Sequence, residues 1–254
     1  MEECAVQWDL QIEDPFPDAF VSHVVPAGDR VLKIQWPHHE SEHEAAALEL
    51  WNGDGAVRLL AHDPDRHALL VERCRPGTYL YEVGAEDALR VLVDLLPRLW
   101  KPAGPPFRSL TEETEWWTIR DEWERTGRPF EEALVDAAED AFEAFVPTQG
   151  EQVLLHQDLH GGNVLAAERE PWLVIDPKPL AGEREFGLAP IIRSFELGHG
   201  RREVVHRLDF LTSELGLDRE RARGWAIGQT IAWSFGGKYQ RRHLETVRWL
   251  VQAR

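Results

Sequence analysis

The sequence predicts an α+β fold with two lobes, in which a small N-terminal antiparallel sheet precedes a larger and mainly helical part. Short apolar segments bounded by glycine and proline are frequent before residue 77 and are typical of strands. Beyond that point, most segments repeat apolar residues at three- and four-residue spacing, which is typical of helices. We therefore expect one lobe over residues 1–76 and a second over residues 77–254.

The first lobe contains a lysine inside an apolar strand. Lys33 lies in VLKIQW, and the alanine- and glutamate-rich segment HHESEHEAAALELW that follows predicts a helix. Taken alone, a lysine at such a position is more often a surface residue that lays its stem along the sheet. If the ammonium group is buried instead, it needs a negative partner. Glu44, at the start of the helix, is the first choice, with Glu40 and Glu42 as alternatives.

Two more strands are expected after this helix. The segment AVRLLAHDPDRHALLVERCRPG predicts a pair of strands joined at DPDRH. The second strand should run from Ala68 to about Arg73 and end before Pro76 and Gly77. By itself, this pattern indicates no more than the end of a hairpin.

The second lobe begins with three amphipathic segments and ends with three more. The first three are AEDALRVLVDLLPRLW, EETEWWTIRDEWERT and FEEALVDAAEDAFEAF, and the last three are expected at about 203–215, 219–235 and 241–253. KPAGPPF predicts a rigid connector after the first of them. The tryptophans of the second segment are candidates for stacking on a sugar ring, although packing between helices is their more common role: Trp116, Trp117 and Trp123.

The segment VLLHQDLHGGNVLAAEREPWLVIDPK, which begins at Val153, carries the strongest functional pattern. It predicts a strand before His156, a bend at its two adjacent glycines, and a second buried strand at Trp172–Ile175. Asp158 then lies in a turn, Asn163 follows it by five residues, and Asp176 ends the second strand.

These three side chains suit a magnesium-dependent phosphoryl transfer. Asn163 and Asp176 offer oxygen atoms, which Mg²⁺ prefers, and phosphate oxygens and water can complete its octahedral shell. Asp158 remains available to accept a proton from an attacking hydroxyl group or to align that hydroxyl group with a phosphoryl group.

A second interpretation treats the same loop as a metal-dependent hydrolase site. His156, Asp158 and His160 form an HxDxH cluster that could bind zinc or iron. No second histidine-rich motif supplies the remaining ligands, because His199 and His206 fall in segments expected to be helical or at the surface. The dinucleotide-binding and P-loop motifs are also absent from the sequence.

HQDLHGGN followed by IDPK resembles the catalytic loop and metal-binding segment of the aminoglycoside phosphotransferases, which are relatives of the protein kinases. The likeness is greatest to the streptomycin 6-phosphotransferase and hydroxyurea-resistance kinase group. It implies a protein-kinase-like fold and an ATP-dependent antibiotic resistance kinase, with GTP as an alternative donor. The acceptor would be a hydroxyl group of a small polar molecule, with an aminoglycoside such as streptomycin as the first candidate.

The resemblance also implies roles for individual residues. Asp158 would be the catalytic base, and Asn163 and Asp176 would bind Mg²⁺. The nucleotide would contact a strand lysine held by a helix glutamate and the main chain after the next strand, which correspond here to Lys33, Glu44, Glu72, Arg73 and Cys74. Lys178, two residues after Asp176, is a candidate for a phosphate or acceptor contact, or an ordinary lysine at the end of a strand.

The sequence departs from the family pattern at two positions. Gly187 occupies the place of an aspartate that relatives often have after the metal-binding aspartate, and which in kinase-like folds hydrogen-bonds the catalytic loop. Glu183 and Glu185 are candidates to replace it. Gln157 stands where glycine is usual. An alternative function is therefore a catalytically impaired protein that binds nucleotide without transferring phosphate.

Composition sets limits on partners. The chain has 45 acidic and 28 basic residues and a formal net charge of −17, which argues against binding to nucleic acid. An acidic field attracts cationic acceptors, although surface carboxylates equally serve solubility. The N-terminus does not resemble a secretory signal and no apolar run approaches a membrane span, so we expect a cytoplasmic protein without a membrane partner. Two isolated cysteines, Cys4 and Cys74, predict free thiols.

Overall fold

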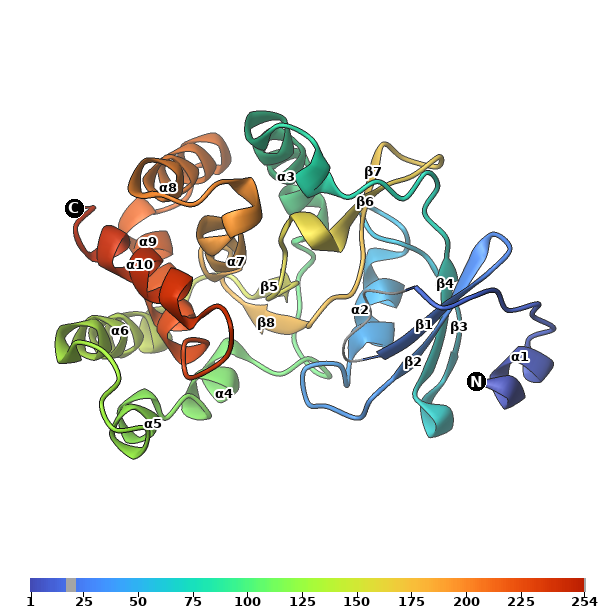
Figure 1. Cartoon of the computed structure of the whole chain (residues 1–254), viewed down its shortest axis with the longest axis horizontal. Helices are drawn as coiled ribbons and strands as arrows, with labels where there is room; N and C mark the ends of the chain where they lie inside the picture. The colour runs from blue at the N-terminus through green and yellow to red at the C-terminus, as the bar shows by residue number, and fades with distance from the viewer. Residues whose placement is uncertain (17–21, 254) are drawn as a thin grey trace. The chain divides into compact units, whose positions relative to one another are not determined.

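The computed structural model describes residues 1–16 and 22–253, which form two compact units (Figure 1). The first unit combines Met1–Leu80 with Gly162–Pro179, and the second combines Tyr81–Gly161 with Leu180–Arg254. The boundary at residue 80 lies close to the expected one at residue 76. The units differ from the expected lobes in one respect, because the segment Gly162–Pro179 belongs to the first unit.

A four-stranded antiparallel sheet is the centre of the first unit. Its strands follow the spatial order β1-β2-β4-β3 and comprise β1 (Ser22–Ala27), β2 (Arg30–Gln35), β3 (Leu59–Asp63) and β4 (Ala68–Glu72). A two-residue turn joins β1 to β2, and its first residue, Gly28, has a φ of 67°, which glycine adopts without steric cost. In the register of the sheet, Lys33 lies between Val24 and Leu69, so the predicted strand around it is present and is an inner strand of the sheet.

Helices cover parts of this sheet. The short helix α1 (Glu2–Gln7) buries Cys4 in a cluster with Val25, Leu32 and Leu70. Because successive side chains of a strand point to opposite faces, the neighbour of Leu32 in β2, Lys33, points away from this cluster. Helix α2 (Glu44–Trp51) buries one face and ends at Asn52, which has the left-handed conformation common at helix ends.

A second hairpin completes the first unit and places two polar residues at its ends. It consists of β6 (Val164–Ala166) and β7 (Trp172–Val174), and hydrogen bonds between Val174 and the segment before β3 attach it to the unit. Asn163 directly precedes β6, and Asp176 follows β7. The N–H group of Ile175 donates to the carbonyl oxygen of Asn163 at 3.0 Å, so the two ends of the hairpin are tied together.

The second unit is mainly helical. A two-stranded sheet pairs β5 (Val153–Leu155) with β8 (Leu180–Gly182). The helices are α3 (Ala85–Leu99), α4 (Leu110–Glu115), α5 (Ile119–Arg125), α6 (Glu132–Phe145), α7 (Ala189–Arg193), α8 (Arg201–Leu215), α9 (Arg219–Ala232) and α10 (Gln240–Val251). Single 3-10 turns occur along the whole chain at Pro64–Arg66, Leu80–Glu82, Val146–Thr148, Gly161–Asn163, Phe186–Leu188 and Phe195–Leu197.

Helix α9 lies at the core of the second unit. Most of its residues are buried, among them Trp225 and Gln229. Gly224 and Gly228 lie against the rings of Phe145 and Phe142 on α6, where any Cβ atom would collide with the ring. The two glycines therefore allow α6 and α9 to approach closely.

The expected helix across EETEWWTIRDEWERT is in fact two helices. Helix α4 ends before Trp116, and α5 begins at Ile119. Trp123 is buried and donates its indole N–H to the carbonyl oxygen of Phe130 at 2.9 Å, while Trp117 packs against Phe142 and Phe186. Packing is thus the role of these two tryptophans. Trp116 is 56% exposed, with the guanidinium group of Arg108 over its ring.

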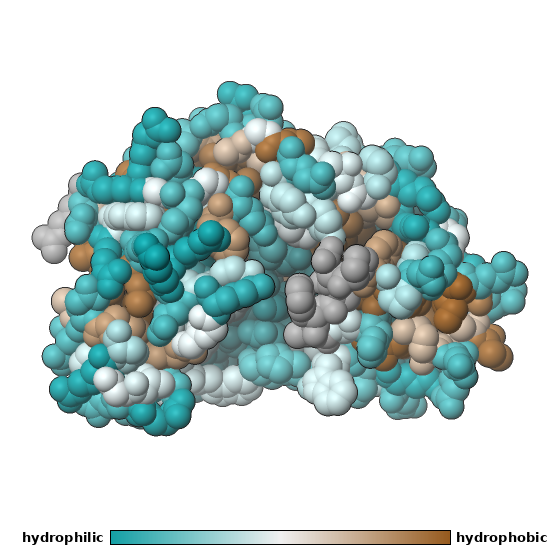
Figure 2. Space-filling model, in the orientation of Figure 1, coloured by the Kyte–Doolittle hydropathy of each residue, from teal (hydrophilic) through white to brown (hydrophobic). Residues whose placement is uncertain are grey.

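The surface is mostly hydrophilic, in line with the charged composition, as the face drawn in Figure 2 shows. Among the described residues, no helix is long and apolar enough to cross a membrane.

Candidate active site

The lysine of strand β2 pairs with the glutamate that begins α2. Lys33 Nζ lies 2.6 Å from Glu44 Oε2, and both side chains are buried. The side-chain amide of Gln35, also on β2, donates to the same carboxylate oxygen at 2.5 Å. The predicted pairing of Lys33 with Glu44 is therefore present. Gln35 is a further hydrogen-bond partner of Glu44, which the sequence did not reveal.

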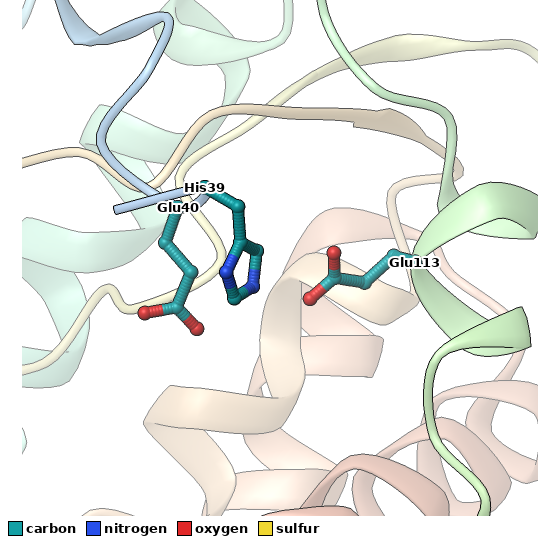
Figure 3. Close-up of side chains that lie close together, drawn as sticks. All are labelled: His39, Glu40 and Glu113. Carbon is teal, nitrogen blue, oxygen red and sulfur yellow. The ribbon is translucent and has the colours of Figure 1, made fainter. Parts of the chain in front are cut away.

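Glu40, one of the alternative partners, has a different neighbour. It lies beside His39 on the loop between β2 and α2 (Figure 3). Its carboxylate is 3.4 Å from Lys178 Nζ and 3.6 Å from a ring nitrogen of His38. Lys178 thus has an acidic partner within the first unit, two residues after Asp176.

Asp176 is the second acidic partner of Lys33. Its carboxylate pairs with the same ammonium group, and its main chain is held in the left-handed region, with a φ of 55°. This side chain is 43% exposed, whereas Glu44 is buried. A single ammonium group therefore lies between a buried and a half-exposed carboxylate, all within the first unit.

Burial and charge shift the pKa values of this group. Burial raises the pKa of Glu44 to about 7, and the negative charge of Asp176 adds to the effect, while Lys33 and Gln35 oppose it. Burial alone would lower the pKa of Lys33, but the two carboxylates outweigh it and raise the pKa of the ammonium group above its ordinary value. Lys33 is therefore positively charged at neutral pH.

The donor set of the first unit fits magnesium bound to a phosphate chain. Asn163 supplies an amide oxygen and Asp176 a carboxylate oxygen, and both are hard ligands of the kind Mg²⁺ selects. A pocket of about 780 Å³ in the same unit is lined by Lys33, Glu44 and Asp176, and its wall continues through residues that include Trp36, His67 and Lys178. This volume is typical of a site for a small molecule.

The loop with Asp158 belongs to the second unit and follows strand β5. The N–H group of Asp158 donates to the carbonyl oxygen of His156 at 2.8 Å, which forms a tight turn. The side chain of Asp158 is 20% exposed, and one carboxylate oxygen lies 3.9 Å from the guanidinium group of Arg193. Asp158 thus combines partial access to solvent with a fixed positive neighbour.

The HxDxH cluster does not form a metal site in the described part of the chain. His156, Asp158 and His160 are not gathered with their ligand atoms directed to a common point. A ring nitrogen of His160 instead lies 3.1 Å from a carboxylate oxygen of Glu196. Burial opposes protonation of His160, but Glu196 and Asp158 together raise its pKa. This contact indicates that His160 braces the loop.

The residues predicted to contact a purine lie at the end of strand β4 and directly after it. The N–H groups of Glu72 and Arg73 are bonded to the carbonyl oxygens of Arg58 at 3.1 Å and Asp29 at 2.9 Å. Burial, with the charge of Glu72, raises the pKa of Cys74 to about 12. Two of the three N–H groups are therefore already bonded within the unit.

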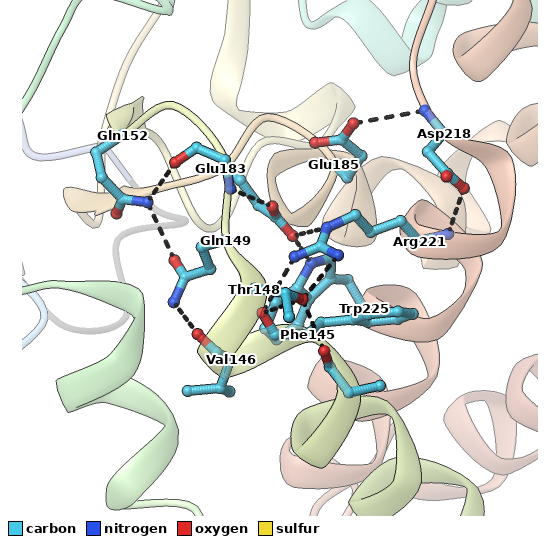
Figure 4. Close-up of polar contacts among 12 residues, drawn as sticks. Phe145, Val146, Thr148, Gln149, Gln152, Glu183, Glu185, Asp218, Arg221 and Trp225 are labelled. Atoms are coloured by element: carbon cyan, nitrogen blue, oxygen red, sulfur yellow. Dashed lines mark hydrogen bonds and ion pairs between the residues drawn. The ribbon is translucent and has the colours of Figure 1, made fainter.

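Neither glutamate proposed to replace the missing aspartate contacts the catalytic loop through the hydrogen bonds of the described residues. Glu183 is buried and accepts hydrogen bonds from the N–H of Gly150 at 3.1 Å, from Arg221 at 2.6 Å and from Trp225 (Figure 4). Glu185 accepts from the N–H of Asp218 at 3.4 Å. These contacts join β8 to α9 and to the segment before β5, so the role of both glutamates is to hold the second unit together.

A sheet with a buried lysine–glutamate pair, followed by a helical unit whose strand β5 leads into an HxD loop, defines the class of kinase-like phosphotransferases. The chain belongs to the family of aminoglycoside/hydroxyurea antibiotic resistance kinases, whose family model matches residues 7–235. The predicted family and the predicted kinase-like fold are both confirmed.

Individual relatives agree with this assignment. The chain is 39% identical to the streptomycin 6-kinase of Streptomyces glaucescens, with a match that covers 91% of this chain and 80% of that protein. It is also 39% identical to the hydroxyurea phosphotransferase of Kitasatospora aureofaciens, over 89% of this chain and 68% of that protein. The crystal structure of the choline kinase LicA from Streptococcus pneumoniae has the same fold, with a TM-score of 0.70, 14% identity, and coverage of 99% and 97% of the two chains.

Proposed function

We propose that this protein transfers the γ-phosphoryl group of ATP to a hydroxyl group of a small polar molecule, with a streptomycin-like aminoglycoside as the first candidate acceptor and GTP as an alternative donor. The observation that carries the proposal is the position of Lys33 between Glu44 and Asp176. A buried ammonium group fixed by a helix carboxylate, next to a carboxylate suited to Mg²⁺, is what a nucleoside triphosphate requires.

The first unit supplies the nucleotide-binding residues in this proposal. Lys33, held by Glu44, neutralises charge on the phosphates, and Asn163 and Asp176 hold Mg²⁺. Mg²⁺ bound there would neutralise part of the negative charge on the phosphates. The main chain at Glu72, Arg73 and Cys74 is proposed to face the purine.

The second unit supplies the catalytic base. Asp158 orients the acceptor hydroxyl group and takes its proton as the oxygen attacks the phosphoryl group. The guanidinium group of Arg193 lies 3.9 Å from Oδ1 of Asp158, so the carboxylate has a buried positive neighbour that limits its movement.

Similarity and charge together support a cationic acceptor. Two relatives that are 39% identical to this chain are named for their action on streptomycin and on hydroxyurea. The formal net charge of −17 favours the approach of a cation over that of an anion. Streptomycin carries positive charge, so it precedes the neutral hydroxyurea among the candidates.

The decisive experiment is ATP consumption with Mg²⁺ across streptomycin, other aminoglycosides, hydroxyurea and simple amino alcohols. Asp158→Ala is the matched variant, and loss of a general base should lower turnover by about two to four orders of magnitude while nucleotide binding is retained. Turnover of the same rate in Asp158→Ala would remove Asp158 from the mechanism. Mg²⁺-dependent ATP binding without turnover of any acceptor would favour the alternative of a catalytically impaired nucleotide-binding protein.

A further inference from the structure

The residue before Asp158 has an unusual conformation for its type. Gln157 has a φ of 61°, in the left-handed region that favours glycine, and its side chain is 1% exposed. A glutamine retains such a conformation only where surrounding contacts determine it. The contacts of Gln157 therefore show what fixes the main chain at the entrance to Asp158.

The side chain of Gln157 is anchored to helix α4. Its amide nitrogen donates to Oε1 of Glu113 at 2.8 Å, and this contact is buried. Glu113 is itself paired with Arg108, and α4 begins with a capping box between Ser109 and Glu112. The anchor is thus a carboxylate on a well-capped helix. The side-chain oxygen of Gln157, Oε1, is buried without a hydrogen-bond partner among the described residues, which is costly for a residue that served stability alone.

The main chain of Gln157 is held from a second direction by helix α9. The side-chain amide of Gln229 donates to the carbonyl oxygen of Gln157 at 3.3 Å. The oxygen of the same amide accepts a hydrogen bond from Arg193. Gln229 is completely buried, so water does not compete for either bond.

Arg193 carries this connection to the carboxylate of Asp158. Its guanidinium group lies over the ring of Trp233, 4.2 Å from the centroid, and 3.9 Å from Oδ1 of Asp158. Gln229 therefore acts on Asp158 by two routes, through the main chain of Gln157 and through the guanidinium group beside the carboxylate.

We propose that Gln157 and Gln229 are positioning residues that fix the catalytic loop, and that they do so in place of the aspartate whose position Gly187 occupies. This inference rests on the proposed role of Asp158 as the base. Glu183 and Glu185 make their contacts elsewhere, whereas the two glutamines contact the residue that precedes Asp158. The loop is thus braced by side chains from α4 and α9.

The test uses two variants of the full chain and one control. Gln229→Met keeps the approximate volume of the side chain and removes both hydrogen bonds, and Gln157→Gly accepts the positive φ but removes the anchor to Glu113. Gln149→Met is the control, because Gln149 is a glutamine of the same unit whose side-chain amide donates hydrogen bonds to Thr111 and Val146. Asp158→Asn is measured in parallel.

Two readouts separate positioning from stability. The first is kcat and KM with Mg-ATP and streptomycin, or the rate of Mg-ATP hydrolysis where streptomycin is not turned over. The second is hydrogen–deuterium exchange of peptides that contain residues 156–160, where the N–H of Asp158 is bonded in the native protein.

We expect both variants to lower kcat about 10- to 100-fold with KM for ATP unchanged, since a misplacement of about 1 Å costs on this order. Exchange at residues 156–160 should accelerate by at least about tenfold, with other peptides and the Gln149→Met control unaffected. Exchange and kcat equal to those of the native protein, or equal changes in the control, would overturn the inference. If Asp158→Asn retains full turnover, the proposed base is wrong, and exchange alone then decides whether the glutamines hold the loop.

Discussion

The ammonium group of Lys33 lies 2.6 Å from Oε2 of Glu44, and it also pairs with Asp176. One positive charge therefore faces two carboxylates. Glu44 is the buried member, and its pKa is raised to about 7 by burial and by the charge of Asp176. Near neutral pH the protein can thus exist with Glu44 either protonated or ionised.

We predict that kcat/KM for Mg-ATP rises with pH and levels off above about 7. When Glu44 is protonated, Lys33 is held mainly by Asp176, the carboxylate that we propose binds Mg²⁺. Loss of the proton returns the ammonium group to Glu44. A pH profile of kcat/KM reports groups of the free enzyme, so it should show a single ionisation near the Glu44 pKa of about 7.

The same ionisation changes the stability of the protein in the opposite direction, because stability falls as the pH rises. Because the pKa of Glu44 is raised from 4.5 in the folded protein, its contribution to stability is present below about pH 4.5 and is lost as the pH rises through about 7. Glu44→Gln should remove both the step in kcat/KM and this stability term. A profile for Glu44→Gln that keeps the same step would assign the ionisation to another group.

We predict that Asp176→Asn lowers turnover by at least about 100-fold and that Asn163→Ala raises the Mg²⁺ concentration needed for half-maximal rate by about tenfold, as expected for loss of one metal ligand. Both residues lie at the ends of the β6–β7 hairpin. Titration of the rate with Mg²⁺ is the measurement. Glu168→Gln, an exposed carboxylate of the same hairpin, is the control, and an equal effect there would show that general charge rather than ligation is responsible.

Local patterns were sufficient to predict much of the first unit. Lys33 stands in a short apolar strand and Glu44 at the start of an alanine-rich helix, and both predictions needed only the residues around them. The strands that precede Asp158 and Asp176 were predicted on the same basis, and they occur at Val153–Leu155 and Trp172–Val174.

The parts that were missed depend on contacts between distant residues. The segment Trp116–Thr118, between α4 and α5, contains no proline or glycine. The spacing of the apolar residues alone therefore predicted one continuous helix. The bonds of Gln157 reach Glu113 and Gln229, which are 44 and 72 positions away along the chain. Buried polar contacts of this kind have no sequence period. The one local signal was a glutamine where the family usually has glycine.

We predict that Glu183→Ala lowers the free energy of unfolding by about 3 to 5 kcal/mol, because it leaves Arg221 without its buried partner. The carboxylate also holds Trp225 and the N–H of Gly150, which are left without their acceptor (Figure 4). Denaturant unfolding followed by tryptophan fluorescence measures the loss. Glu185→Ala is the control, since its carboxylate accepts one long hydrogen bond and should cost about 1 kcal/mol or less.

The same variant tests the role of Glu183 in catalysis. Because its contacts go to α9 and to the segment before β5, kcat per folded molecule should stay within about threefold of the native value, as for a residue that touches neither substrate nor base. A loss of kcat in Glu183→Ala at a temperature where the variant is folded would show that Glu183 does replace the family aspartate.

The last prediction concerns the glycine at the position of that aspartate. Gly187 is buried, and a Cβ atom there would lie 3.1 Å from a methyl group of Leu155 and 3.8 Å from the indole nitrogen of Trp100. A carboxylate at this position would face an apolar side chain and one neutral donor. We expect Gly187→Asp to lower the free energy of unfolding by at least about 2 kcal/mol, the cost of burying an incompletely bonded polar group, without an increase in kcat.

Gly187→Ala separates the effect of charge from that of volume. The added methyl group meets only the flexible end of Leu155, so we expect a change of less than about 1.5 kcal/mol. If Gly187→Asp instead raised kcat and slowed hydrogen exchange at residues 156–160, the native loop would be incompletely braced and Gly187 would limit the activity. If it destabilises the protein while kcat is unchanged, the contacts of Gln157 and Gln229 are sufficient to hold Asp158, and the family aspartate is dispensable in this chain.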